Sequence, residues 1–238
     1  MDMTKARNGT LAPQRVLSRP GATLTASPRV RYDGIQAELS HSRIGFGRTL
    51  TSYWRFLLAA LAKQGQTGAI VPSQRFLIDQ MIAPVPRNYR GQIIELGAGT
   101  GALTLRLAAR CPAARILACE INPALAQDIQ SKILAAGLAQ RVQVISGSAQ
   151  RLLAAIAQGQ STRPDFIFSG IPLGNQARDR VTALIDSISY ALAEGGMYIQ
   201  FQYSLLDRKT IKAKFATLRT VPAFLNLPPA FVYYAVKR

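Results

Sequence analysis

The sequence predicts an α/β fold with a doubly wound, mostly parallel sheet of seven strands. Short apolar segments that read as strands alternate with amphipathic helical segments between residues 92 and 203, a pattern typical of parallel strands joined by right-handed crossovers. A glycine-rich turn follows the first of these strands, and an acidic residue ends the second. Both features fall at the carboxyl ends of the strands, where sheets of this class bind their ligands.

The predicted strands and helices alternate without an internal repeat. Five strands are expected at 92–96, 115–120, 141–146, 165–170 and 196–203. Four helices are expected at 101–110, 123–136, 149–157 and 176–193. A basic amphipathic segment follows Tyr203, and two further short strands are expected near 217–225 and 230–236. We expect these last two strands to form an antiparallel hairpin that completes the sheet.

The chain divides into three expected regions. Residues 1–48 are rich in Arg, Ser, Thr, Pro and Gly, which predicts a basic, flexible arm. Residues 49–90 are expected to form an N-terminal helical lid, with an aromatic-rich helix at 51–63 and a second helix that Ser73 caps. Residues 91–238 are expected to carry the sheet and the ligand site.

Charge and composition limit the kinds of partner and compartment that the protein can have. The net charge is +17 and the pI is about 10.8, which predicts an anionic partner, either nucleic acid or an acidic membrane surface. Cys111 and Cys119 have neither metal-ligand spacing nor a disulfide pattern, so no metal is expected and a reducing cytoplasm is indicated. We see no signal peptide, and the apolar run at 56–62 is too short to span a bilayer. The protein is therefore expected to be soluble or peripheral.

The glycine-rich turn predicts an adenosine-containing cofactor. Glycines at 97, 99 and 101 lack the Cβ atoms that would keep a ligand from the backbone, and the next helix points its free N–H groups at the same place. Glu120 ends the next apolar run, 120 − 101 = 19 residues after the last glycine. That spacing suits a carboxylate that accepts hydrogen bonds from a ribose.

Two details favour S-adenosylmethionine over NAD. The glycines are spaced G-x-G-x-G, a tighter turn than a pyrophosphate loop uses. Glu95 stands two residues before the first glycine, where a carboxylate has no use beside a pyrophosphate but can hold the cationic amino group of a methionine moiety.

The exit of the fourth strand predicts the class of acceptor. Enzymes that methylate the amino group of a nucleobase carry Asn or Asp here, followed after a proline-containing pair by an aromatic residue. Aligned on Pro172, this chain has Gly170 in place of the amide and Leu173 in place of the aromatic ring. Both devices for holding a base are lost, although stacking contributes about 1–3 kcal/mol per base where it exists. A small, flexible amine on an apolar body fits better.

Several sequence blocks resemble those of bacterial phospholipid N-methyltransferases, which are class I methyltransferases. These enzymes methylate phosphatidylethanolamine towards phosphatidylcholine with S-adenosylmethionine, and close relatives methylate the amine of ornithine lipids. The resemblance covers about residues 53–236. The blocks are Gly68-Ala-Ile-Val-Pro-Ser73, Glu95-Leu-Gly-Ala-Gly-Thr-Gly101, Ser169-Gly-Ile-Pro-Leu173, Gln200-Phe-Gln-Tyr203 and Asn226-Leu-Pro-Pro-Ala230.

The resemblance implies a set of cofactor-binding residues. It assigns Glu95 and the glycines to the methionine end, Glu120 to the ribose, and Ser148 with Ala149 to the adenine. Ser148 departs from the pattern, because relatives commonly have Asp at this position. The full expected set is Ser73, Glu95, Gly97, Ala98, Gly99, Gly101, Glu120, Ile121, Ser148, Ala149 and Ser169.

The acceptor side is expected to hold and align a lipid amine. Methyl transfer is a direct displacement at the sulfonium methyl, so the protein must align a neutral amine. Tyr53 and Tyr203 are the catalytic candidates, because their rings can hold an ammonium by cation–π contact and their hydroxyls can accept from it; either could equally be a core residue. The expected substrate-binding residues are Gly170, Ile171, Pro172, Leu173 and Arg180, the last as a candidate for the lipid phosphate.

The expected partners are an anionic membrane surface and an aminolipid, with no obligatory nucleic acid. The resemblance thus implies a protein bound peripherally to the cytoplasmic face of the inner membrane, where a basic aromatic helix can lie among the headgroups. Two alternatives stay open. A ribosomal RNA adenine N6-methyltransferase would explain the positive charge, but Gly170 and Leu173 speak against it. A non-enzymatic, cofactor-binding peripheral membrane module is the other alternative, and the intact glycine and acidic positions speak against that one.

Overall fold

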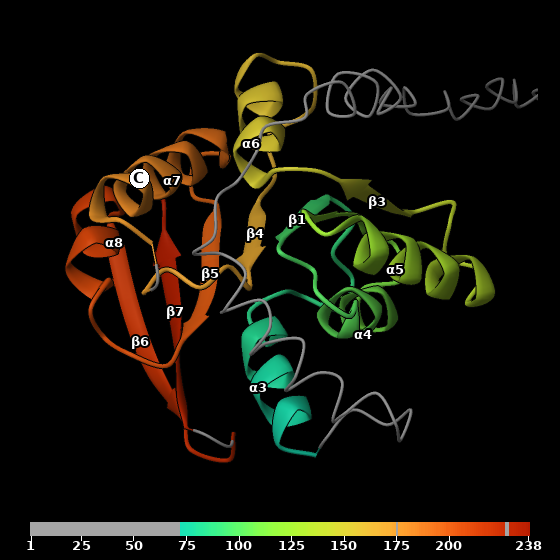
Figure 1. Cartoon of the computed structure of the whole chain (residues 1–238), viewed down its shortest axis with the longest axis horizontal. Helices are drawn as coiled ribbons and strands as arrows, with labels where there is room; N and C mark the ends of the chain where they lie inside the picture. Colours follow the sequence, from blue (N-terminus) through green and yellow to red (C-terminus); the bar gives the residue numbers. More distant parts are fainter. Residues whose placement is uncertain (1–71, 175, 227–228) are drawn as a thin grey trace, which may run out of the picture.

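The computed structural model describes residues 72–174, 176–226 and 229–238 (Figure 1). Its strands are β1 (Gln92–Leu96), β2 (Arg115–Glu120), β3 (Val142–Ser146), β4 (Phe166–Ser169), β5 (Met197–Gln202), β6 (Thr217–Ala223) and β7 (Ala230–Val236). Its helices are α3 (Pro72–Ile82), α4 (Ala102–Arg110), α5 (Pro123–Ala135), α6 (Ala149–Ala157), α7 (Arg178–Ala191) and α8 (Arg208–Lys214).

The seven strands form one sheet in the order β3-β2-β1-β4-β5-β7-β6. The first five strands run parallel to one another. β7 pairs antiparallel with both β5 and β6 and lies between them. This arrangement confirms the predicted doubly wound, mostly parallel sheet with an antiparallel hairpin at its end.

Helices cover both faces of the sheet (Figure 1). α6, α7 and α8 pack on one face, and α3, α4 and α5 pack on the other. The central strand shows why both faces need cover, since all five residues of β1 are buried. Neighbouring residues of a strand point to opposite faces, so Ile94 joins the first core while Ile93 joins the second.

The predicted boundaries of the elements are close to the observed ones, with two differences of substance. α3 begins at Pro72, a residue suited to the first helical position because its fixed φ needs no N–H; Ser73 is therefore inside the helix and the predicted cap is wrong. α7 begins at Arg178 instead of 176, because the chain after β4 is still turning where Gln176 N–H donates to the Leu173 carbonyl at 3.0 Å.

The predicted arm and the aromatic-rich helix at 51–63 lie outside the described residues. Within the part of the chain that the structure describes, every helix is too short or too polar to cross a membrane. The same part contains no group of three His, Cys, Asp or Glu side chains that could hold a metal ion.

The carboxyl ends of the five parallel strands meet at one edge of the sheet. The loop after β1 leads to α4 on one face, whereas the loop after the neighbouring β4 leads to α7 on the other face. Such a divergence opens a crevice where ligands bind in open α/β sheets. The fold therefore directs attention to the loops at 97–101, 121–122, 147–148, 170–177 and 203–207.

Candidate active site

The glycine loop between β1 and α4 is shaped by three residues in the left-handed region. Gly97, Gly99 and Gly101 have φ values of +74°, +59° and +80°, which side chains rarely tolerate. A Cβ on Gly97 would lie 3.1 Å from Ile171, and one on Gly101 would lie 3.1 Å from Ile129. At Gly99 no described atom lies within 4 Å of that position. Two glycines thus permit close packing, and the third leaves a side of the loop open to a ligand.

Glu120 holds the glycine loop against the end of β2. Its Oε2 accepts from Gly99 N–H at 2.8 Å, and its Oε1 accepts from Asn122 N–H at 2.8 Å. Burial raises the pKa of the Glu120 carboxyl, and the backbone N–H groups oppose that rise. Each oxygen keeps a lone pair for a ribose hydroxyl. The side chain has no exposed surface.

Glu95 lies beneath the loop, between β1 and α4. Its side chain is almost fully buried, and Thr104 Oγ1 donates to its Oε2 at 2.5 Å. Burial raises the pKa of Glu95 to about 8; the Thr104 hydrogen bond lowers it, and the nearby Glu120 charge raises it further. A cationic amino group beside this carboxyl would favour its ionised form. This is the behaviour expected of a partner for the methionine end of the cofactor.

The residues assigned to the adenine lie along the exits of β2 and β3. The Gly147 N–H donates to the Glu120 carbonyl at 2.9 Å and ties the two exits together. Ser148 precedes α6, where its hydroxyl donates to Gln150 Oε1 at 2.9 Å instead of capping the helix. Ile121 is exposed beside Glu120 and Ala149 is buried under Ser148, so the fold gathers these residues on one side of the glycine loop.

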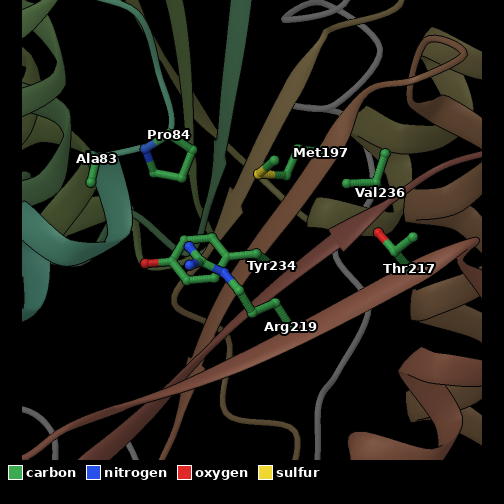
Figure 2. A pocket seen from close by; sticks show the side chains of 7 residues that line it. All are labelled: Ala83, Pro84, Met197, Thr217, Arg219, Tyr234 and Val236. Atoms are coloured by element: carbon green, nitrogen blue, oxygen red, sulfur yellow. The ribbon is translucent and has the colours of Figure 1, made fainter.

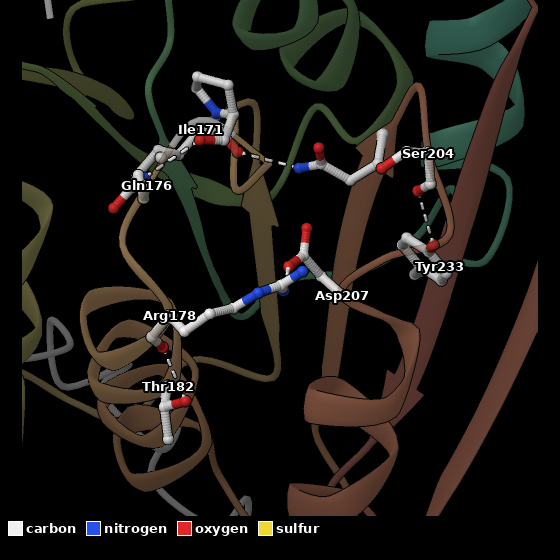
Figure 3. A network of polar contacts seen from close by, with 9 residues as sticks. Ile171, Gln176, Arg178, Thr182, Ser204, Asp207 and Tyr233 are labelled. Carbon is white, nitrogen blue, oxygen red and sulfur yellow. Dashed lines mark hydrogen bonds and ion pairs between the residues drawn. The ribbon is translucent and has the colours of Figure 1, made fainter. Parts of the chain in front are cut away.

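Amide side chains from β5 fix the loop that leaves β4. The Ile171 carbonyl accepts from Gln200 Nε2 at 2.9 Å and from Gln202 Nε2 at 3.1 Å, and both amides are buried. The Ile171 N–H donates to Ser169 Oγ at 3.2 Å, and Gln176 Nε2 donates to the Pro172 carbonyl at 3.2 Å. The loop is therefore held in one conformation by its neighbours, as part of the network in Figure 3 shows.

Gly170 and Leu173 have structural reasons for their identity. The Gly170 N–H donates to the Leu96 carbonyl at 2.9 Å, and a Cβ on Gly170 would lie 2.9 Å from the Gly97 carbonyl oxygen. Any side chain here, including the amide of nucleobase enzymes, would push against the glycine loop. Leu173 is fully buried in the core under α6 and α7. Of the predicted acceptor residues on this loop, Ile171 and Pro172 carry the partly exposed side chains.

The remaining predicted residues divide into three groups. Tyr203 directly follows β5, is 49% exposed and packs edge-to-face on Phe201 at 5.9 Å between centroids. Arg180 is exposed in the first turn of α7. Tyr53 lies outside the described residues, as does the side chain of Ser73.

Asp207 is a site residue that the sequence pattern did not predict. This residue lies between β5 and α8 and has no exposed surface. Arg178 Nη1 contacts its Oδ1 at 2.6 Å, whereas its Oδ2 is buried without a hydrogen-bond partner among the described residues. One signal could have found it, because Asp207 is the only acidic residue after Glu194 and begins a strongly basic segment.

A separate groove lies away from these loops. It has a volume of about 430 Å³ and is lined by Ala83, Pro84, Met197, Thr217, Arg219, Tyr234 and Val236 (Figure 2). Met197 begins β5 and pairs with Val236 at the end of β7, so the groove opens at the amino ends of the parallel strands. The Arg219 guanidinium lies 4.8 Å from the centre of the Tyr234 ring. None of its lining residues belongs to the loops described above, and we assign it no part in the candidate site.

Comparisons with known proteins agree with this geometry. Residues 93–196 match a methyltransferase domain family. An ornithine lipid N-methyltransferase from Singulisphaera acidiphila is 26% identical over 170 residues, which cover 70% of this chain and 86% of that protein. A protein described as a probable dimethyladenosine transferase, from Dictyostelium discoideum, is 31% identical over 71 residues, which cover 30% of this chain and 22% of that protein.

Solved structures share the fold at low sequence identity. A precorrin-6Y C5,15-methyltransferase from Geobacter metallireducens superposes with a TM-score of 0.53 and 15% identity, covering 68% of this chain and 87% of that chain. A SAM-dependent methyltransferase from Agrobacterium tumefaciens gives a TM-score of 0.54 and 14% identity, covering 71% of this chain and 63% of that chain. Residues 93–196 therefore form a methyltransferase domain, the sheet has the fold of class I methyltransferases, and S-adenosylmethionine is the cofactor.

Proposed function

We propose that this protein transfers a methyl group from S-adenosylmethionine to the amine of a membrane aminolipid. The favoured acceptor is the terminal amine of an ornithine lipid. Phosphatidylethanolamine is the second candidate, because the sequence blocks around Ser169-Gly-Ile-Pro-Leu173 and Asn226-Leu-Pro-Pro-Ala230 resemble those of phospholipid N-methyltransferases.

The observation that carries the proposal is the loop after β4. Gly170 has no room for an amide, because a Cβ there would meet the Gly97 carbonyl oxygen at 2.9 Å. Leu173 is buried and offers no ring for stacking. A flat nucleobase would therefore lack both its hydrogen-bond partner and its stacking partner. An amine on a flexible chain needs neither.

The relatives support the same choice. The ornithine lipid N-methyltransferase aligns with this chain over 86% of its own length. The match to the dimethyladenosine transferase covers 22% of that protein. The lipid N-methyltransferase alignment covers a much larger share of both proteins, which is why we favour a lipid amine over an adenine.

A surface at the same edge of the sheet supports a membrane partner. Five large apolar side chains are exposed in the loop after β5 and in the β6–β7 turn: Tyr203, Leu205, Leu206, Phe224 and Leu225. Basic side chains of α8 follow directly along the chain, at Arg208, Lys209, Lys212 and Lys214. Apolar side chains flanked by basic ones are typical of proteins that bind an anionic membrane surface. We accordingly propose peripheral binding at the cytoplasmic face of the inner membrane.

The residues of the site have separable roles in the proposed reaction. The bound cofactor supplies an electrophilic methyl group on a sulfonium. The glycine loop, Glu95 and Glu120 hold the donor in one orientation, while Ile171 and Pro172 line the approach of the amine. Tyr203 directly follows β5 at the same edge of the sheet, where its half-exposed ring can contact an ammonium. Catalysis then comes chiefly from alignment of donor and acceptor.

The proposal is tested with methyl-labelled S-adenosylmethionine and anionic phosphatidylglycerol vesicles that contain ornithine lipid or phosphatidylethanolamine. We expect label in the aminolipid and none in vesicles of phosphatidylglycerol alone. A Gly99→Val variant, which forces a β-branched residue to φ +59°, serves as the inactive control. Label in ribosomal RNA with none in either aminolipid would overturn the proposal in favour of the adenine alternative.

A further inference from the structure

The candidate is the ion pair between Arg178 and Asp207, which lies between the exits of β4 and β5. Arg178 is the first residue of α7, after the acceptor loop, and Asp207 follows β5. The two side chains differ sharply in exposure, since that of Arg178 is 61% exposed and that of Asp207 is 0% exposed. Figure 3 shows the carboxylate with one oxygen turned toward Arg178 and the other turned away from it.

The unpaired oxygen is the unusual feature of this pair. Asp207 Oδ2 is buried without a hydrogen-bond partner among the described residues. A buried carboxylate oxygen without a partner is costly, and such a group in a native structure requires an explanation. The group is also too deep to be solvated as a surface charge. The position therefore calls for a ligand that donates hydrogen bonds.

The surrounding donors are already committed elsewhere. Tyr198 Oη donates to Gln200 Oε1 at 2.5 Å, and Tyr233 Oη donates to the Ser204 carbonyl at 3.0 Å. Burial raises the pKa of Tyr233 to about 12, and the charge of Asp207 adds to this rise. Both tyrosine hydroxyls are thus paired with other acceptors, and Oδ2 has no partner among the described residues.

We infer that Arg178 and Asp207 form the recognition site for a zwitterionic lipid headgroup, with the substrate's ammonium on Asp207 Oδ2 and its anionic group on Arg178. This inference rests on the proposed function and names the part of the substrate that the site reads. Ornithine lipids and phosphatidylethanolamine both carry an amine and an anionic group, a carboxylate in the first and a phosphate in the second. A headgroup of this kind can exchange with the existing ion pair and leave no charge without a partner.

The same contact gives the amine proton a destination. The substrate amine is bound as an ammonium, and one N–H proton passes to Asp207 Oδ2. The freed nitrogen lone pair forms the new bond to the methyl carbon as the bond between that carbon and sulfur breaks. S-adenosylhomocysteine leaves with the electron pair on sulfur, and the proton leaves Asp207 for the water that enters as the methylated headgroup departs. Asp207 therefore binds the substrate and accepts its proton.

The first experiment measures binding of water-soluble headgroups to the full chain in the presence of S-adenosylhomocysteine. Glycerophosphoethanolamine and Nα-acetylornithine each carry both charges, and ethanolamine carries the amine alone. We expect the zwitterions to bind the wild type, and Asp207→Asn to weaken their binding about 10- to 100-fold, as loss of a charged hydrogen bond does. Ethanolamine should bind weakly to both. Equal binding of the zwitterions to wild type and Asp207→Asn would overturn the inference.

Matched variants separate a local loss from a folding defect. Asp186→Asn removes the acid of the exposed Lys214–Asp186 pair, whose atoms lie 2.7 Å apart, and should leave headgroup binding unchanged. Arg178→Lys keeps the positive charge but loses the planar set of donors of the guanidinium. It should therefore weaken binding of the zwitterionic headgroups about 10-fold. All variants must retain S-adenosylhomocysteine affinity. If Asp207→Asn fails to fold, Arg178→Lys decides the matter, and unchanged headgroup binding there would reject the site.

The vesicle assay distinguishes this inference from the proposed function. If the wild type labels an aminolipid and Asp207→Asn does so with unchanged kcat and KM, the function stands and the headgroup site is wrong. If the wild type labels no aminolipid yet binds the zwitterions through Asp207, the site stands and the function is wrong. A joint success requires labelling by the wild type and at least a 10-fold fall in kcat/KM for Asp207→Asn.

Discussion

The two halves of the candidate site are held together by different kinds of contact. On the side of β1, β2 and β3, backbone groups dominate, as where Gly97 and Ala98 N–H donate to the Cys119 carbonyl at 2.8 and 3.1 Å. On the side of β4 and β5, buried amide side chains do the same work through Gln200 and Gln202. The first half is therefore set by backbone conformation, and the second by side chains that a substitution can remove singly.

The largest effect is expected for Glu120, the side chain that supports the half of the site held by backbone contacts. Glu120→Ala removes the acceptor for the Gly99 and Asn122 N–H groups and the expected ribose contact. Each stranded donor costs about 1–3 kcal/mol, so we expect S-adenosylhomocysteine affinity to fall about 100-fold and unfolding to become easier by about 2–6 kcal/mol. Titration calorimetry and denaturant melts measure the two losses.

A matched control uses the exposed Glu194, which is paired with Lys237 at 3.0 Å. Glu194→Ala should change stability by less than about 1 kcal/mol, as for other surface pairs. Unchanged cofactor affinity in Glu120→Ala would reject the assignment of this carboxylate.

The next effect depends on pH. The pKa of Glu95 is about 8 in the folded chain, against 4.5 for the free side chain, so between these values the folded state binds the extra proton. Its contribution to stability is complete below about pH 4.5 and is lost as the pH rises towards 8. The difference in unfolding free energy between wild type and Glu95→Gln should change by about 1.4 kcal/mol per pH unit in this window. A difference that stays constant from pH 5 to pH 7 would contradict the raised pKa.

A smaller effect tests the contact between the two halves. Gly170→Asn introduces a Cβ 2.9 Å from the Gly97 carbonyl oxygen, and such overpacking costs about 1–3 kcal/mol. We expect weaker cofactor binding and no gain of activity on RNA. Gly174→Ala is the control, because no described atom lies within 4 Å of the new Cβ. The melting temperatures of both variants measure the cost. Equal melting temperatures would show that the close approach of the two loops does not limit the side chain at position 170.

The smallest effect is expected in the half held by side chains. Gln202→Ala removes one of the two amides on the Ile171 carbonyl and leaves Gln200 in place. Loss of one hydrogen bond is worth about 1 kcal/mol, so kcat/KM for the aminolipid should fall about 5-fold with unchanged cofactor affinity. Gln160→Ala, on the exposed turn after α6, should have no effect. Equal losses of cofactor affinity and lipid turnover would show that the halves are not separable.

The same contrast explains what the sequence could predict. The glycines at 97, 99 and 101 are readable because their conformation admits few other residues, and Glu120 follows them at a characteristic distance. The alternation of apolar strand patterns and helix patterns predicted the order of the elements. The prediction that Ser73 caps a helix was wrong, because Pro72 is itself a good first helical residue. These features are local in the chain, so a linear pattern carries them.

The acceptor half is not local. Gln200, Gln202 and Asp207 come from the segment around the end of β5, yet they act on a loop about thirty residues earlier, as the 29-residue separation of Gln200 and Ile171 illustrates. The positions of these three residues in the sequence are equally compatible with an ordinary strand followed by the start of a helix, so they do not indicate a site. Leu173 looked like a pocket wall because its neighbours are loop residues, whereas the turn directs it into the core. Pairing between β4 and β5 had to be known before these contacts could be seen.

The close approach of Gly170 to Gly97 also bears on how such a protein could evolve. A side chain at position 170 would press on the Gly97 carbonyl oxygen, so a substitution that alters the acceptor side is felt at once by the cofactor side. A change of acceptor through position 170 would therefore be expected to require a compensating change in the glycine loop.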